Sequence, residues 1–548
     1  MPNGVAQLAV DRELARAPGS EVQVTTSSDI PAAPGRRPLL SRRRGAVAGL
    51  VAGAVSMATA ELLAGLVPGV PSLVVAVGAL VIALQPPGAK QLVADLFGTA
   101  DKLALNVAVV LVALAIAAIV GVRARRSFGE AAAVFVAFGL LAFAGAVVAE
   151  LDPLPASLLS ASVAVASGIA TLRFLLRGPA HPSVNPTITP MPDWARRRFL
   201  IASGSLLGGA AAAGLVGRSL LDSRHPAGVP VAASLPVPAE RVPPLSADES
   251  LPVNGITPIV EPNDAFYRID TALLVPQVDA TTWQLKVTGM VHHPLTFSYA
   301  DLLAMPLFEQ YVTIACVSNV VGGDLVGNAL WTGVRLKGLL AEAGVDPAAS
   351  QIVGRSVDGF TVGFPTSWAL DPAREPMVAL GMNRVPLPAE HGYPARLIVP
   401  GLYGYVSATK WLAEVELTTE AAFDAYWVRL GWAKDGPILT QSRIDVPRQG
   451  DDLPAGATEI FGVAWAPDRG ISRVEVKIDD GAWQAAMLSR AISKATWVQW
   501  LLRWDATPGQ HRIEVRATDG TGQVQTAVRS DPPPDGARGH QTIHVTVH

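Results

Sequence analysis

The sequence predicts a multi-domain chain: an N-terminal α-helical membrane domain, a central α+β domain and a C-terminal all-β, immunoglobulin-like sandwich. Three observations predict this order. Long apolar runs fill the chain up to residue 221, mixed strand and helix patterns begin near residue 249, and short alternating runs begin near residue 436. Hydrophobic residues make up 50% of the 548 positions and charged residues only 16%, so much of the chain is expected to lie in lipid.

The N-terminal region contains a polar tail and then six apolar runs. Residues 1–40 are rich in Pro, Ala, Ser and Arg without periodicity, which predicts a disordered cytoplasmic tail. A helical membrane domain is expected over residues 41–180. A spanning helix needs about 20 apolar residues, so the second run is short for a span. The runs lie at 46–67, 72–84, 103–121, 130–150, 155–176 and 199–221.

The arginines beside these runs predict the orientation, because short cytoplasmic loops are enriched in positive charge. Arginines at 36–44 place the N-terminus inside, and arginines at 123–126 place the loop after the third run inside as well. Both conditions hold only if the second run does not cross. We therefore predict that residues 72–98 form a re-entrant or interfacial segment on the outer side. Five spans remain, and the chain beyond residue 222 is expected outside the cytoplasm.

The sixth run allows two interpretations. The stretch ARRRFLIASGSLLGGAAAAGLVG is similar to a twin-arginine export signal placed inside the chain, which would suit a domain that folds before export. The alternative is a positively flanked membrane anchor. Residues 181–221 are accordingly predicted as a cytoplasmic loop and a twin-arginine-like anchor helix. A Pro/Ala/Ser-rich linker is predicted at 222–248.

Composition narrows what the membrane domain can carry and what the chain can bind. No histidine precedes His181, and a membrane haem most often needs paired histidines, so this domain is not expected to carry haem. Glu61 is an intramembrane carboxylate and therefore a functional candidate. The formal net charge of -3 and the lack of a basic groove argue against a nucleic-acid partner.

Cys316 is the only cysteine in the chain, so neither an internal disulfide nor a cysteine-rich zinc or iron–sulfur site can occupy it. A lone cysteine is either a soft metal ligand, as a thiolate, or a small buried hydrophobe. The run YVTIA at 311–315 predicts a strand that leads into it. A loop through Gly322-Gly323-Asp324 and Gly327-Asn328 follows, and WTGVRLKGLLAEAG then predicts a helix.

Three motifs resemble the sulfite-oxidase-like molybdopterin enzymes: the C-x-x-N that begins at Cys316, GDLVGNALWTGVRL after it, and HGYPARLIVPGLYGYVSATKWL downstream. The resemblance is strong over about residues 250–435 and moderate over the remaining C-terminus. It implies a sulfite-oxidase-type molybdopterin domain at 249–435 in which Cys316 ligates molybdenum. The implied cofactor is Mo-molybdopterin, and haem, flavin and iron–sulfur groups are not expected.

The resemblance also implies which residues contact the cofactor. An F-x-R pattern places Phe266, Tyr267 and Arg268 against the pterin and the metal. Arg268 would be the cation nearest the metal's oxo groups and therefore catalytic, whereas its alternative is a surface salt bridge. Asn263 matches the asparagine that begins this element in bacterial relatives. Asp270 stands where sulfite oxidases have histidine.

Later loops supply the other implied cofactor contacts. His391 and Arg396 match a cofactor-binding pair, and residues 407–410 match a loop that holds the phosphate and the pterin edges. Asp358 matches an acidic cofactor contact, although in the hairpin predicted at 351–365 it is equally a turn aspartate. The four residues of the phosphate loop are Ser407, Ala408, Thr409 and Lys410.

Two further departures from the family pattern bear on the substrate. Sulfite oxidases have a tyrosine before an E-M-N run, whereas this chain has Leu380 before Gly381-Met382-Asn383. The family's basic segment near the end of the domain has become YWVRLGWAKDG, where Arg429 is the candidate replacement. With Asp270, these departures bring the chain nearer the bacterial periplasmic members, whose known type reduces protein-bound methionine sulfoxide.

Residues 436–548 predict the all-β domain, because five short alternating runs are separated by Gly, Pro and Asp turns and Asp480-Gly481 is a hairpin signal. The length and spacing suggest an immunoglobulin-like sandwich, and the resemblance implies a Mo-co dimerisation-type domain and thus a possible homodimer. Trp497, Trp500 and Trp504 are expected either at that interface or in the core.

These features predict a membrane-anchored molybdopterin oxidoreductase, N-terminus inside and catalytic domain on the outer face of the cytoplasmic membrane. It would transfer an oxygen atom and two electrons to or from a small oxyanion or sulfoxide-type substrate. A separate electron-transfer partner is expected, because the chain has no signature for haem, flavin or iron–sulfur ligation. The alternative is a non-catalytic membrane receptor or adhesion protein with the β-sandwich as binding head, which molybdenum analysis would distinguish.

Overall fold

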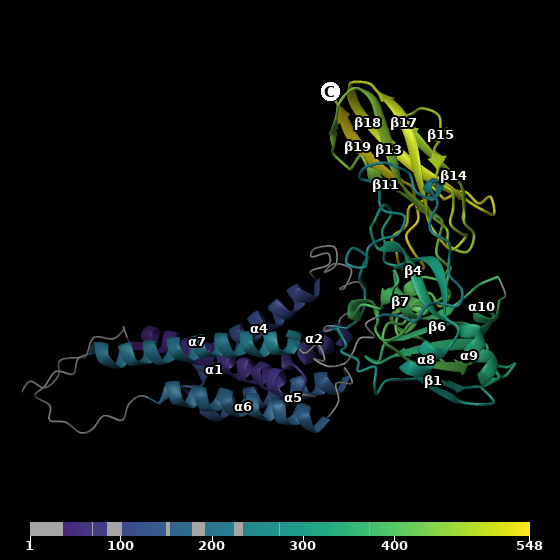
Figure 1. Cartoon of the computed structure of the whole chain (residues 1–548). Helices are drawn as coiled ribbons and strands as arrows, with labels where there is room; N and C mark the ends of the chain where they lie inside the picture. The colour runs from purple at the N-terminus through teal and green to yellow at the C-terminus, as the bar shows by residue number, and fades with distance from the viewer. Residues whose placement is uncertain are drawn as a thin grey trace, which may run out of the picture.

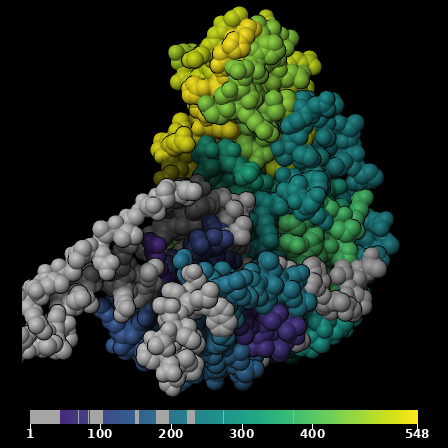
Figure 2. Space-filling view, turned by 90° about the vertical axis from the view of Figure 1, so that its left-hand side faces the viewer, coloured from purple at the N-terminus to yellow at the C-terminus, as the bar shows by residue number. Residues whose placement is uncertain are grey.

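The computed structural model describes residues 37–67, 70–84, 101–148, 154–177, 192–223, 234–272, 275–371 and 373–548. It contains a helical bundle, a central domain of strands and short helices beside the bundle, and a β module above the central domain (Figure 1). In the space-filling view the β module, in yellow and yellow-green, stands as a lobe on the teal and green central domain (Figure 2). Most of the predicted tail at 1–40 and the end of the predicted segment 72–98 lie outside the described residues.

Among the described residues, five helices are long and apolar enough to cross a membrane, and they coincide with the five predicted spans. The additional helix α2 has 12 residues, too few for a span. Glycines let the backbone of α1 approach two neighbours closely: a Cβ on Gly121 would lie 2.6 Å from the Cα of Gly49, and one on Gly65 would lie 2.7 Å from the Cα of Gly217. The helices are α1 (Arg37–Leu66), α2 (Leu73–Leu84), α4 (Asp101–Arg123), α5 (Phe128–Val148), α6 (Leu154–Leu176) and α7 (Pro192–Ser223).

The arginine-bearing ends of the helices lie together at one end of the bundle. The guanidinium of Arg44 on α1 lies 4.7 Å from the ring centre of Phe199 on α7. The guanidinium of Arg173 on α6 lies 6.0 Å from the ring centre of Phe128 on α5. At the other end, Ser72 Oγ donates to Glu61 Oε1 at 2.6 Å and so ties the start of α2 to α1. This arrangement agrees with the prediction that the arginine-rich segments lie on one side of the membrane. Which end of the bundle faces the cytoplasm stays a prediction.

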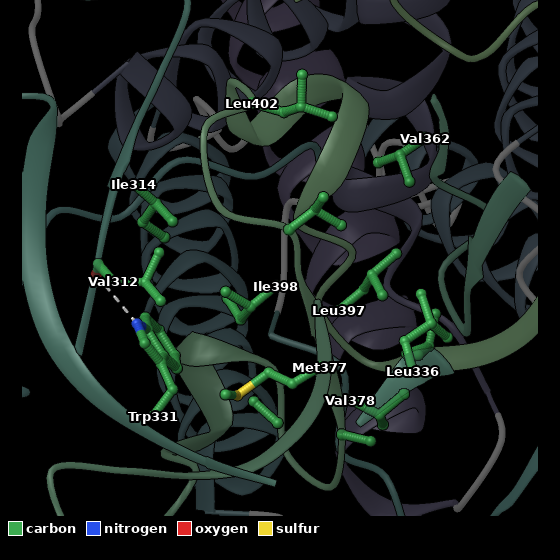
Figure 3. Packing of buried hydrophobic residues seen from close by; sticks show 14 of the residues in the cluster. Val312, Ile314, Trp331, Leu336, Val362, Met377, Val378, Leu397, Ile398 and Leu402 are labelled. Atoms are coloured by element: carbon green, nitrogen blue, oxygen red, sulfur yellow. Dashed lines mark hydrogen bonds between the residues drawn. The ribbon is translucent and has the colours of Figure 1, made fainter. Parts of the chain in front are cut away.

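The central domain contains two sheets, with strand orders β2-β1-β10-β5-β6 and β3-β4-β7-β8, and β9 pairs with β7. One hydrophobic core joins residues of both sheets. Figure 3 shows part of this core, where Trp331 of β4 donates from Nε1 to the carbonyl of Val312 on β3 at 3.2 Å. The strands are β1 (Gln284–Gly289), β2 (Leu295–Ser298), β3 (Phe308–Ala315), β4 (Val326–Arg335), β5 (Gln351–Ser356), β6 (Thr361–Pro365), β7 (Met377–Met382), β8 (Val385–Pro386), β9 (Arg396–Ile398) and β10 (Leu412–Thr418). The short helices are α8 (Tyr299–Ala304), α9 (Leu336–Ala343), α10 (Thr366–Leu370) and α11 (Gly404–Ser407).

The helix predicted from Trp331 onward was placed too early, because the structure has strand β4 there and begins α9 only at Leu336. Gly327 and Asn328 also belong to β4 and not to the cysteine loop. Strand β4 pairs with β3 on one side and with β7 on the other, so these neighbours satisfy its backbone along its length. Tertiary pairing therefore overrides the helical tendency of this stretch.

The β module is all-β as predicted, and the immunoglobulin-like assignment stays a prediction. Its two sheets have the orders β11-β13-β17-β16 and β12-β19-β18-β14-β15, and residues of both share one hydrophobic core. The Asp480-Gly481 turn connects β14 with β15, which pair antiparallel as the hairpin signal predicts. The strands are β11 (Gln441–Val446), β12 (Asp452–Leu453), β13 (Gly456–Trp465), β14 (Ile471–Ile478), β15 (Gln484–Ala485), β16 (Met487–Leu488), β17 (Val498–Ala506), β18 (Gly509–Asp519) and β19 (Gln541–Val547).

Trp497 joins the β module to the central domain within one chain. Its ring is fully buried in the central core, its Nε1 donates to the carbonyl of Ile259 at 2.9 Å, and its backbone N–H donates to Thr313 Oγ1 at 2.8 Å. Trp500 is fully buried in the core of the module. Both rings are therefore core residues, and they are not available to a dimer interface. Trp504 is only partly buried.

We expect Trp497→Ala to lower the free energy of unfolding by about 3–5 kcal/mol, because it leaves a large cavity and removes the Nε1 hydrogen bond to Ile259 between the module and the domain. Denaturant unfolding of the full chain measures this loss. The control Trp504→Ala should cost clearly less, since that ring is half-exposed. Equal losses in the two variants would contradict the core role of Trp497.

Candidate active site

Cys316 lies directly after β3, at the start of a short loop that returns into β4. Its backbone N–H donates to the carbonyl of Leu325 at 2.9 Å, and the N–H of Leu325 donates to Asn319 Oδ1 at 2.9 Å. The sulfur is half-buried and lies 2.9 Å from Ser318 Oγ. Loop geometry thus holds the thiol at the end of a buried strand and not inside the aliphatic core.

Two tyrosines, Tyr267 and Tyr403, lie near enough to Cys316 for its charge to influence them. Burial raises the pKa of Tyr267, and a negative charge on Cys316 raises it further. Burial likewise raises the pKa of Tyr403 to about 12, with a smaller contribution from Cys316. Tyr267 stacks on Phe266 with the ring centres 5.2 Å apart, so the predicted aromatic pair and the cysteine belong to one neighbourhood.

The segment that carries Asn263 is tied to the rest of the domain by amide hydrogen bonds. Asn263 Nδ2 donates to the carbonyl of Met382 at 3.3 Å, and its Oδ1 accepts from Asn383 Nδ2 at 2.8 Å. Asn383 itself adopts a positive φ of 53°, a conformation that asparagine tolerates better than most residues. The asparagine in the G-M-N run therefore positions Asn263.

His391 and Arg396 lie together in the interior, as the matched pair predicts. His391 Nε2 lies 2.8 Å from the carbonyl oxygen of Asn263, and Arg396 Nη1 donates to the carbonyl of His391 at 3.3 Å. The Phe266 ring meets His391 edge to face, with the ring centres 5.6 Å apart. Burial, helped by Arg396, lowers the pKa of His391 to about 4, so this ring is neutral near pH 7. Burial also lowers the pKa of Arg396 to about 10.

Asp270 connects the two other predicted cations. Arg268 Nε and Lys410 Nζ both lie 3.0 Å from Asp270 Oδ2, which is almost completely buried. Burial lowers the pKa of Lys410 to about 8, and Asp270 opposes this shift. The aspartate found in place of the family's histidine therefore acts as a shared counter-ion. The salt-bridge alternative for Arg268 describes a real contact, although its partner is buried and not on the surface.

Buried polar atoms without partners among the described residues mark where a bound group fits. They are His391 Nδ1, Arg396 Nε and Thr409 Oγ1. Leaving such atoms unpaired is costly, and a phosphate-bearing heterocycle would supply both acceptors and donors to them. Among the described residues, no group of three His, Cys, Asp or Glu side chains is placed to hold a metal ion. The residues present thus fit molybdopterin.

The remaining predicted residues build the surrounding loops. Ser407 Oγ donates to the carbonyl of Tyr403 at 2.9 Å, and the N–H of Ala408 donates to that of Gly404 at 3.0 Å. Both shape the loop before Thr409 and Lys410. Asp358 Oδ1 accepts from the N–H of Phe360 at 3.2 Å, which is the turn role. Its turn lies beside the Lys410 loop, because the N–H of Val357 donates to the carbonyl of Trp411 at 2.9 Å.

Arg429 lies in the short turn η4 (Val428–Leu430), where its side chain is exposed. Its backbone N–H donates to the carbonyl of Ala425 at 3.2 Å. Its candidacy as a substrate cation stays a prediction.

A cavity of about 640 Å³ opens between the central domain and the β module. The central domain contributes Tyr267, Arg268 and Leu325 to it, and the module contributes Arg443 and Asp445, with further lining from Phe266, Glu261, Asp324 and Gln541. The carbonyl of Leu325 accepts from the N–H of Cys316, so this cavity opens beside the cysteine loop.

The sequence patterns missed two groups that shape the cavity, Arg443 and Glu261. Arg443 Nη1 donates to the carbonyl of Gly323 in the cysteine loop at 3.2 Å, and its Nη2 donates to Thr257 Oγ1 at 2.8 Å. More than a hundred residues separate Arg443 from the loop that it holds, so no local pattern could reveal the contact. Glu261 had one local signal, because it lies two positions before Asn263 in PIVEPND.

The lowered pKa of Lys410 predicts how retention of the cofactor depends on pH. If a charged Lys410 binds the anionic phosphate, the bound state holds a proton that the free protein loses above a pKa of about 8. The affinity should therefore fall as the pH rises through about 8, by up to about tenfold per pH unit. Molybdenum content after gel filtration at a series of pH values measures this.

Two variants separate Lys410 from other groups. Lys410→Gln should retain little molybdenum and lose this pH dependence. Lys337→Gln removes a lysine paired with Glu375 elsewhere in the same domain and should follow the wild-type curve. An unchanged decline with pH in Lys410→Gln would show that another group titrates.

Comparison with known proteins adds a family match. Residues 272–427 match the family described as "Oxidoreductase molybdopterin binding domain". Mitochondrial sulfite oxidase of Homo sapiens is 30% identical over 350 residues, which cover 55% of this chain and 62% of that protein. The uncharacterized oxidoreductase YuiH of Bacillus subtilis (strain 168) is 35% identical over 158 residues, which cover 29% of this chain and 76% of that protein. The crystal structure of the sulfane dehydrogenase SoxCD from Paracoccus pantotrophus matches at 24% identity with a TM-score of 0.46, over 58% of this chain and 91% of that chain.

Proposed function

We propose a reaction for this chain from one premise, which is that it belongs to the sulfite-oxidase-like family of molybdopterin-dependent oxidoreductases. The chain spans about 62% of the length of the human relative, so its own activity and substrate are proposals. We propose that it catalyses two-electron oxygen-atom transfer on a small oxyanion or sulfoxide-type substrate. When bound, the molybdenum cofactor supplies the centre that exchanges an oxygen atom and two electrons with the substrate.

The observation that carries this proposal is the set of buried polar atoms on His391, Arg396 and Thr409 that have no partner among the described residues. Cys316 would ligate the metal. His391, Arg396 and Thr409 would bind the cofactor through the Nδ1, Nε and Oγ1 atoms that lack partners among the described residues. Lys410 would bind the phosphate. The remaining cofactor contacts are proposed for Asn263, Phe266, Tyr267, Arg268, Asp358, Ser407 and Ala408.

The charges around the cavity favour a neutral sulfoxide-type substrate over an oxyanion such as sulfite. Arg268 and Lys410 share Asp270 as counter-ion, and Arg443 Nε lies 2.6 Å from Asp445 Oδ1. An incoming anion would have to compete with these carboxylates for the cations, whereas a neutral sulfoxide needs only a donor for its oxygen. Arg268 is the proposed donor, because it is the cation that lies beside Tyr267 in the cavity wall.

We propose a cellular setting from the helices and the charge pattern. Five apolar helices support a multi-pass membrane anchor, with the N-terminus inside and the catalytic domain on the outer face of the cytoplasmic membrane. A separate protein would exchange electrons with the cofactor, and two copies could pair through the β module. The proposed divisions of the chain fall at residues 41–180, 181–221, 222–248, 249–435 and 436–548, with a twin-arginine-like signal in the second.

Assay of the purified, molybdenum-loaded full chain against sulfite, methionine sulfoxide and trimethylamine N-oxide tests the proposal. Reduced viologen serves as electron donor for the oxides and ferricyanide as acceptor for sulfite. We expect turnover of an oxide and little turnover of sulfite. Protein that holds stoichiometric molybdenum and turns over none of the three would contradict the proposed reaction.

A further inference from the structure

We propose that Glu261 exchanges the proton with the reacting oxygen across the cavity, a role that rests on the proposed oxygen-atom transfer. Glu261 precedes the Pro262-Asn263 segment of the cofactor site and lines the same cavity as Tyr267 and Arg268. Its Oε2 atom is buried and has no hydrogen-bond partner among the described residues. A buried carboxyl oxygen without a partner is costly when it is ionised, which favours the protonated form of this side chain.

The fold holds this carboxylate close to the cysteine loop. The backbone N–H of Glu261 donates to the carbonyl of Asn328 on β4 at 2.9 Å. A Cβ on Gly327 would lie 2.2 Å from Glu261 Oε2, so only glycine there leaves room for the carboxylate. Gly327 pairs with Ile314 on β3, two positions before Cys316. The carboxylate therefore lies over the same strand pair that delivers the thiol.

The charged groups around Glu261 keep its proton within reach at neutral pH. Burial raises its pKa to about 7, Asp445 and Asp324 add to the shift, and Arg443 opposes it. Tyr267, Arg268 and Arg448 are the remaining titratable side chains of the cavity wall. A general acid or base works best when its pKa lies near the operating pH, and this carboxyl meets that condition.

The step balances as follows for an oxide substrate: XO + 2H⁺ + 2e⁻ → X + H₂O, where the bond from sulfur or nitrogen to oxygen breaks. The substrate is reduced, and the electrons come from the external donor through the cofactor. The carboxyl group of Glu261 gives one proton to the departing oxygen through a cavity water, and bulk water supplies the second proton. Glu261 is then reprotonated from solvent. In the oxidative direction the same carboxyl group accepts the proton.

The sign of the pH dependence follows from this role. Oxide reduction needs protonated Glu261, so its rate should fall as the pH rises through about 7. In Glu261→Gln this fall of the rate with pH should disappear, and the rate at low pH should be about 10²-fold or more below that of wild type. Glu261→Asp keeps a carboxyl and should keep a pH limb. The control Glu459→Gln removes a carboxyl from the surface of the β module and should behave as wild type.

Two readouts do not depend on turnover. In infrared difference spectra across about pH 7, the carbonyl band of a protonated carboxylic acid should be present in wild type and absent in Glu261→Gln. The pKa is higher in the folded chain, about 7, than its ordinary value of 4.5, so protonation stabilises the fold and this stabilisation is lost as the pH rises from about 4.5 to about 7. The Tm of wild type should therefore fall more over this range than that of Glu261→Gln.

The outcomes separate this inference from the reaction on which it rests. Wild type that transfers oxygen, together with a Glu261→Gln variant that keeps the same pH limb and rate, would overturn the role of Glu261 alone. An infrared band that persists in Glu261→Gln would assign the titration to another group. It too would overturn the role of Glu261 alone. A molybdenum-loaded wild type without oxygen transfer would overturn the proposed function and this role with it.

Discussion

Replacing Cys316 by serine should abolish oxygen-atom transfer, with a loss of at least about 10³-fold in turnover. A serine hydroxyl is protonated at neutral pH and is a hard, weak ligand, so it cannot replace a thiolate at a soft metal centre. The fold should persist, because the loop is held by the backbone bond from Cys316 to Leu325 and by Asn319. Turnover of the oxide substrate and molybdenum content, measured on the same preparation, check this expectation.

Thermal unfolding and a distant serine variant provide the controls. Cys316→Ser should unfold near the wild-type temperature, which would exclude misfolding as the cause of lost activity. Ser472→Ala, whose hydroxyl donates to the carbonyl of Asp519 in the β module at 2.7 Å, should keep wild-type turnover. Activity that survives in Cys316→Ser would remove the thiolate from the reaction.

Replacing Arg396 by glutamine should lower the molybdenum content of the purified protein more than about tenfold. The guanidinium is buried against Trp331, with its centre 5.2 Å from the ring centre, and its Nε has no partner among the described residues. Burying a charge without full pairing is costly, so the fold bears that cost to keep a cation for an anionic group. Elemental analysis and the absorption spectrum of the bound cofactor measure the loss.

The matched control is Arg355→Gln in the same domain. Arg355 forms an ion pair with Glu416, and its side chain is about one-third exposed. It should keep wild-type molybdenum content. Arg396→Gln should unfold at or above the wild-type temperature when both proteins are free of cofactor, because a poorly compensated charge has been removed. Full molybdenum content in Arg396→Gln would contradict the cofactor role.

Much of the fold follows from local sequence patterns. The five long apolar helices and the short α2 follow from run length and charge parity, and the hairpin of β5 and β6 follows from alternation around Asp358-Gly359. The stretch from Trp331 was misassigned as helix, because its strand state depends on two neighbours, β3 and β7, that are distant in the sequence. The place of Trp497 in the central core could not be read from the sequence for the same reason, because its partners Ile259 and Thr313 lie roughly 180 or more residues away.

Part of the candidate site could likewise be read from the sequence, and part depended on the folded chain. The identity of Cys316, the His391 and Arg396 pair and the residues from Ser407 to Lys410 could be read from motifs, because each motif is short and continuous. The role of Asp270 could not, since one carboxylate is shared between Arg268 and Lys410 only after the chain folds. The wall that the β module adds to the cavity also depends on contacts between distant segments.

The sequence by itself determined the kind of chemistry, because residue identity fixes which side chain is a soft ligand and which are fixed cations. It also determined which segments are long and apolar enough to cross a bilayer. Only the tertiary structure decided which of those charges are neutralised, which acid lines a cavity beside the cysteine loop, and that the last domain forms part of the wall of that cavity. Burial and pairing are properties of groups brought together from distant positions, and no single stretch of the chain contains them.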